Sequence, residues 1–146
     1  MDNQKIQVFI SSSMQREDNL DWKDIREKLT TELKGNPLFK PFNLSDHSAP
    51  GDLTSYYLDQ LSQSDLVIFL IGPVVRNGTY KEFEKTIQLN KRHMFFFDES
   101  FCERDMPYDN PEVKMSSKDF MQNTSVDNLG VYRKLDLINF NCEEVM

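Results

Sequence analysis

The sequence contains no apolar run approaching the ~20 residues that a membrane-spanning helix requires. Its N-terminus, MDNQKIQ, lacks the cationic and apolar blocks of a signal peptide. The two cysteines, Cys102 and Cys142, do not have the spacing of a metal site or of a disulfide framework. These absences predict a soluble protein of the reducing cytoplasm, without a membrane partner.

An excess of basic residues is also missing, since 17 Lys and Arg stand against 24 Asp and Glu and the net charge is -7. Non-specific contact with a phosphate backbone depends on clustered cations, so we expect no nucleic acid partner. The two histidines, His47 and His93, are far apart and have no third ligand near them in the sequence. We therefore expect no metal site and no cofactor.

The remaining composition is that of a globular domain, with 146 residues of which 38% are hydrophobic and 28% charged. The segment LVIFLI at 66–71 is apolar without alternation and is bounded by Asp65 and Gly72, which predicts a strand buried on both faces. Strand and helix patterns alternate along the chain. Strands are predicted at 5–10, 38–42, 66–71 and 94–97, and helices at 18–33, 53–61 and 80–90.

This alternation predicts parallel strands joined by right-handed crossovers, with helices on both faces of the sheet. The expected fold class is α/β, a flavodoxin-like doubly wound parallel sheet of about five strands in the order 2-1-3-4-5. Residues 1–100 are expected to form the core. Residues 101–146, with a short helix at 117–122 and a last strand within 132–140, are expected to complete the domain or extend it. The ending NCEEVM resembles a first helical turn, so we expect other domains of a longer chain.

Ligands of such a sheet bind outside the carboxyl ends of the strands, where the strand order reverses between the first and third strands. The loops expected there are 11–13, 43–52 and 72–79. Serine hydroxyls bond ribose hydroxyls well, Gly72 allows close backbone approach, and the helix that starts near Tyr80 directs free N–H groups into the crevice.

Glu82 is expected in the first turn of that helix, and two interpretations of it are open. Thr79-x-x-Glu82 fits a capping box, in which the carboxylate only closes the helix start. The helix dipole also favours the ionised form of a carboxylate there, which suits a group that stabilises or attacks a ribosyl cation. These local patterns permit both roles.

Four segments resemble TIR-like domains of bacterial defence and signalling proteins: VFISSS, SAPGDL, LSQSDLVIFLIG and GTYKEFEKTIQLNKRHMFFF. The resemblance implies cleavage of NAD, as a substrate, at the nicotinamide–ribose bond, giving ADP-ribose or a cyclic derivative. Glu82 falls on the catalytic glutamate of the family, with Glu84 as its rival. The resemblance also implies self-association through the loop 43–52, which covers the substrate.

The family commonly has a Trp shortly before this glutamate, where the chain has Thr79 and Tyr80, so stacking on the substrate either falls to Tyr80 or is absent. The missing Trp favours another interpretation, a non-catalytic interaction module. The expected substrate-binding residues are Ser11, Ser12, Ser13, Asp46, Gly72, Thr79 and Tyr80.

The segment IGPVVRNGTYKEFE also resembles the nucleoside deoxyribosyltransferases, which use the glutamate of a Gly-Thr-x-x-Glu sequence as the nucleophile on the sugar. Their preceding Asp is replaced here by Asn77 or Arg76, which leaves open the source of a proton for the leaving base. Both resemblances imply a carboxylate at the anomeric carbon of a ribose. The shared expectation is cleavage of an N-glycosidic bond, in NAD or in a nucleoside or nucleotide.

Overall fold

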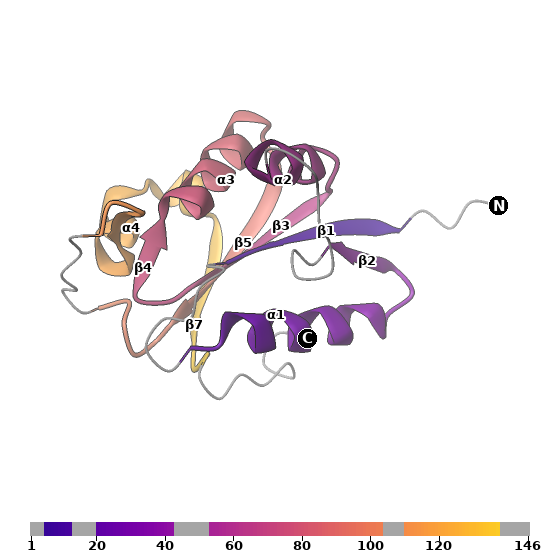
Figure 1. The fold of residues 1–146 in the computed structure, drawn as a ribbon, viewed down its shortest axis with the longest axis horizontal. Coiled ribbons are helices and arrows are strands. Elements are labelled where there is room, and N and C mark those ends of the chain that lie inside the picture. The colour runs from indigo at the N-terminus through magenta and orange to yellow at the C-terminus, as the bar shows by residue number, and fades with distance from the viewer. Residues whose placement is uncertain (1–4, 13–19, 43–52, 104–109, 138–146) are drawn as a thin grey trace.

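The computed structural model of the chain describes residues 5–12, 20–42, 53–103 and 110–137 (Figure 1). Five strands pair in parallel in one sheet of order β2-β1-β3-β5-β7. Their bounds are Ile6–Ser11 (β1), Phe39–Phe42 (β2), Leu66–Ile71 (β3), Arg92–Asp98 (β5) and Val131–Leu135 (β7). Counted along the chain, these strands have the order 2-1-3-4-5. The predicted flavodoxin-like doubly wound fold is therefore confirmed.

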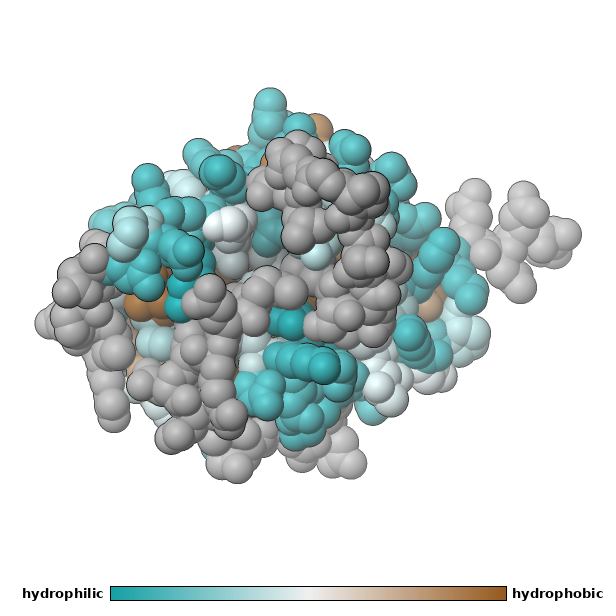
Figure 2. All heavy atoms as spheres, viewed as in Figure 1, coloured by the Kyte–Doolittle hydropathy of each residue, from teal (hydrophilic) through white to brown (hydrophobic). Residues whose placement is uncertain are grey.

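Helices cover both faces of this sheet, with α1 (Trp22–Lys34) on one face and α2 (Leu53–Ser62) and α3 (Asn77–Gln88) on the other (Figure 1). Helix α1 begins where the side chain of Asp21 accepts a hydrogen bond from Asp24 N at 3.2 Å, as an N-cap residue does. Its apolar positions recur at helical spacing and are buried. The surface over α1 and α3 is mostly hydrophilic, as expected for helices that bury one side (Figure 2).

The side chains of β3 divide the core into two layers because they alternate across the sheet. Ile68 and Leu70 pack on the α1 face, whereas Val67, Phe69 and Ile71 pack on the α3 face. All five are buried, as predicted. Each layer thus holds the strand ends in place from one side.

The segment 72–79, predicted to be a loop, contains the strand β4 (Val74–Arg76), which pairs antiparallel with β6 (Val113–Ser116). Helix α3 consequently begins at Asn77 rather than near Tyr80. The long-range partners of Asn77 explain the early start, because its N–H donates to Glu112 O at 2.9 Å and its Nδ2 to Pro111 O at 2.7 Å.

The chain after β6 returns to the main sheet. Helix α4 (Ser117–Asn123) confirms the predicted short helix, and α5 (Val126–Leu129) leads into β7. Strand β7 pairs with β5 and ends at Leu135, whereas the sequence pattern placed a strand within 132–140. Among the described residues, no helix has the length and apolarity needed to cross a bilayer.

Candidate active site

Ser11 and Glu82 meet at the carboxyl edge of the sheet. Ser11 is the last residue of β1 and pairs with Phe69 of β3. The strand order of the sheet reverses between these two strands. Its Oγ donates a buried hydrogen bond of 2.7 Å to Glu82 Oε1. Two residues that are 71 positions apart in the sequence are thus brought together at the predicted site.

Glu82 is the sixth residue of α3, on the buried face that it shares with Thr79, Phe83 and Thr86. The predicted capping box is therefore wrong: the N-cap residue is Arg76, and no side chain caps the helix. The carbonyl of Glu82 accepts a hydrogen bond from Thr86 Oγ1 at 2.7 Å. Glu84 is exposed, so the structure separates the two glutamates that the sequence left as rivals.

Burial raises the pKa of Glu82 to about 7, and the hydrogen bond from Ser11 partly opposes this rise. The expectation of a stably ionised carboxylate is wrong for two reasons. Glu82 lies beyond the first turn of α3, and the helix dipole acts mainly within that turn. Glu82 is also buried, with only 7% of its surface exposed, and burial disfavours the charged form. Near neutral pH, Glu82 is therefore poised between its acid and its base form.

Tyr80 lies on a different side of α3 from Glu82 and packs into an aromatic cluster. Its ring centroid lies 5.9 Å from that of Phe83 and 6.4 Å from that of Phe120, and Lys114 Nζ lies 5.3 Å from it over the ring. The ring already has protein neighbours on several sides. Stacking of Tyr80 on a substrate stays a prediction.

The other predicted binding residues have several different placements. Thr79 is buried one turn before Glu82 on the same helix face. A Cβ at Gly72 would lie 2.7 Å from Leu20 Cδ1 and from Trp22 Cζ2, so this glycine has a packing role against the α1 layer. Ser13 and Asp46, like the loop 43–52, lie outside the described residues.

Two buried ionisable groups, Arg26 and Asp98, were not predicted from the sequence. Arg26 Nη1 donates to Ser12 Oγ at 2.9 Å. A basic residue on the apolar face of a helix is the sequence signal that could have identified it. Asp98 ends β5 and accepts from Ser100 N at 2.8 Å, and burial raises its pKa. Within the described ranges, no group of three His, Cys, Asp or Glu side chains is placed to hold a metal.

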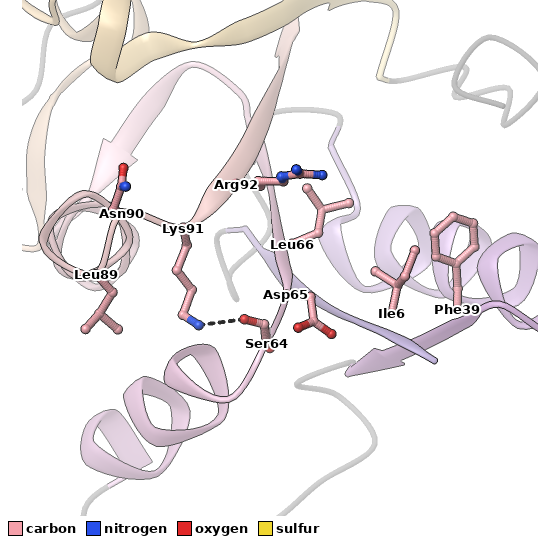
Figure 3. Close-up of a pocket in the computed structure, with 9 residues that line it drawn as sticks. All are labelled: Ile6, Phe39, Ser64, Asp65, Leu66, Leu89, Asn90, Lys91 and Arg92. Carbon is pink, nitrogen blue, oxygen red and sulfur yellow. Dashed lines mark hydrogen bonds between the residues drawn. The ribbon is translucent and has the colours of Figure 1, made fainter. Parts of the chain in front are cut away.

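A pocket of about 550 Å³ lies at the opposite edge of the sheet, at the amino ends of the strands (Figure 3). Two of its charged groups already have partners, since Lys91 Nζ donates to Ser64 O at 2.7 Å and Asp65 accepts from Gln7 N at 2.8 Å. The lining residues are Ile6, Phe39, Ser64, Asp65, Leu66, Leu89, Asn90, Lys91 and Arg92. Because Glu82 lies at the carboxyl ends of the strands, this pocket is separate from its site.

Replacing Ser11 with Ala is expected to raise the pKa of Glu82 further above 7, because the hydrogen bond from Ser11 stabilises the ionised carboxylate. Titration of ¹³C-labelled glutamate carboxyl groups by NMR measures the change. Ser64→Ala is the matched control, since Ser64 is also buried but bonds Gln60 O near the opposite edge. An unchanged Glu82 titration in Ser11→Ala would show that the bond has no such effect.

No protein-family model matches this chain, and no curated protein matches it in sequence. Among solved structures, it is similar to a 2-desoxiribosyltransferase from Leishmania mexicana. The two share 14% sequence identity over 90% of each chain, with a TM-score of 0.57. At this identity the likeness shows the fold alone.

Proposed function

We propose that this protein cleaves the N-glycosidic bond of a nucleoside or nucleotide, with Glu82 as the carboxylate that engages the anomeric carbon. One observation carries the proposal: a buried carboxyl group is held by Ser11 at the switch point of a parallel sheet. The fold likeness to a protein named as a deoxyribosyltransferase supports a nucleoside or nucleotide as the substrate.

The reaction follows from the chemistry of this carboxyl group. Ionised Glu82 attacks the anomeric carbon as the bond to the base breaks, and the base leaves with the bonding electron pair. Water or a second base then attacks the same carbon and releases the carboxylate. The Ser11 hydroxyl orients Oε1 throughout, which leaves Oε2 for the sugar.

NAD is the second candidate substrate, and the residues that precede Glu82 favour it. Asn77 and Arg76 stand where a deoxyribosyltransferase has an acid, and neither side chain carries an acidic proton at neutral pH. Asn77 is bonded to Pro111 O, and Arg76 Nη1 lies 3.5 Å from Glu112 Oε2. Nicotinamide leaves NAD as a neutral molecule without protonation, whereas most nucleobases leave more easily when protonated.

A panel of substrates tests the proposal. The chain is incubated at high concentration, because TIR-like enzymes need assembly, with nucleosides, deoxynucleosides, their monophosphates and NAD. Chromatography then measures free base and nicotinamide. Release of a nucleobase supports the main proposal, and release of nicotinamide supports NAD as the substrate. Release from none of them contradicts both and favours a non-catalytic interaction module.

A further inference from the structure

The neighbouring residues Ser11 and Ser12 make buried hydrogen bonds on opposite faces of the sheet. Ser11 Oγ donates to Glu82 Oε1 on the α3 face, whereas Ser12 Oγ accepts from Arg26 Nη1 of α1. We infer that Arg26 is a positioning residue for Glu82: by holding Ser12, it fixes the end of β1 from which Ser11 orients the carboxyl group. The catalytic consequence of this inference rests on the proposed function.

The placement of Arg26 is unusual for a purely structural residue. Arg26 is 1% exposed and lies on the apolar face of α1, next to Ile25 and one turn before Thr30. Burial lowers its pKa, although the charges of Glu27, Asp21 and Tyr57 favour the cationic form. A Leu or Met would fill this position without the cost of removing a guanidinium from water. The buried hydrogen bond to Ser12 gives the cation a specific task.

Ser12 is the position from which such a task affects the site. The ladder between β1 and β3 ends at Ser11, paired with Phe69, so Ser12 has left the regular strand pairing. Its side-chain bond to Arg26 restrains the chain at Ser12, directly after Ser11. A displacement of about 1 Å at a catalytic group costs up to about 100-fold in rate, so loosening this end is expected to matter.

Titration of Glu82 by ¹³C NMR tests the inference without requiring any activity. Like Ser11→Ala, the substitutions Arg26→Met and Ser12→Ala are expected to raise the pKa of Glu82. They leave the hydrogen bond from Ser11 Oγ to Glu82 Oε1 less well ordered. Arg26→Lys is expected to restore the titration in part, since a lysine retains the charge but not the planar donor fork. Leu29→Ala, a buried change on the same helix, is the control for general destabilisation.

With a substrate that the enzyme cleaves, Arg26→Met is expected to lower kcat by up to about 100-fold with little change in KM. The inference is overturned if Glu82 titrates as in the wild type in both Arg26→Met and Ser12→Ala, or if Leu29→Ala shifts it equally. Ser12→Ala removes only one hydroxyl and so keeps the test valid if Arg26→Met does not fold. A shifted titration without base release from any substrate would support the positioning role and contradict the proposed function.

Discussion

Replacing Glu82 with Gln is expected to lower the rate of base release by about 10³-fold or more. The amide keeps the shape of the side chain and accepts the hydrogen bond from Ser11, but it neither attacks the anomeric carbon nor carries the charge that stabilises a ribosyl cation. Loss of a general acid or base alone typically costs 10²- to 10⁴-fold, and loss of a nucleophile adds to this. The measurement is base or nicotinamide release under saturating substrate.

Glu84→Gln is the matched control for this experiment. Glu84 lies on the same helix two positions later and is exposed, so its substitution is expected to leave the rate within about twofold of the wild type. Equal rates for the wild type and Glu82→Gln would refute the catalytic assignment. The role of this carboxyl group would then be structural only.

The same Glu82→Gln substitution is expected to stabilise the folded protein above pH 7 by about 3 kcal/mol. Glu82 has a pKa of about 7 in the folded protein, against an ordinary value of 4.5. The folded state therefore binds more protons than the unfolded state between these values, and the free energy of unfolding falls as pH rises through this range. A pKa difference of about 2.5 corresponds to about 3 kcal/mol at 1.36 kcal/mol per unit. Glutamine does not titrate and avoids this loss.

Urea unfolding of both proteins at pH 5 and pH 8 measures the effect. The two free energies of unfolding are expected to differ by less than about 1 kcal/mol at pH 5 and by about 3 kcal/mol at pH 8, with Glu82→Gln the more stable. Titration of Asp98, whose pKa is also raised by burial, is common to both proteins and cancels in the comparison. A capping carboxylate would behave in the opposite way, because its loss destabilises the helix at neutral pH.

Local sequence patterns were sufficient to predict the main sheet. The run at Leu66–Ile71 and the phenylalanines Phe95, Phe96 and Phe97 are apolar over one strand length. All of them except the half-buried Leu66 are buried in the structure. The antiparallel pair of β4 and β6 was missed because Val74 pairs with Ser116, far along the chain in a polar region. That pairing sets the start of α3, so the register of Glu82 on its helix was also misplaced.

The candidate site was predicted in position but not in its electrostatics. The order of strands alone brings the ends of β1 and β3 together, which placed Ser11 and Glu82 at one edge. The pKa of Glu82 depends on how deeply the carboxyl group is buried. Burial results from tertiary packing, which a local helix-start pattern does not predict. Arg26 escaped attention for a similar reason, since its partner Ser12 is on another element.

The pocket at the amino ends of the strands has a consequence for ligand screening. Strand β3 has six residues and rises about 3.3 Å per residue, so roughly 20 Å separates this pocket from the edge that carries Glu82. A compound that occupies the pocket would raise the melting temperature without displacing a substrate. Thermal-shift hits therefore need a competition assay before any of them is taken as an inhibitor.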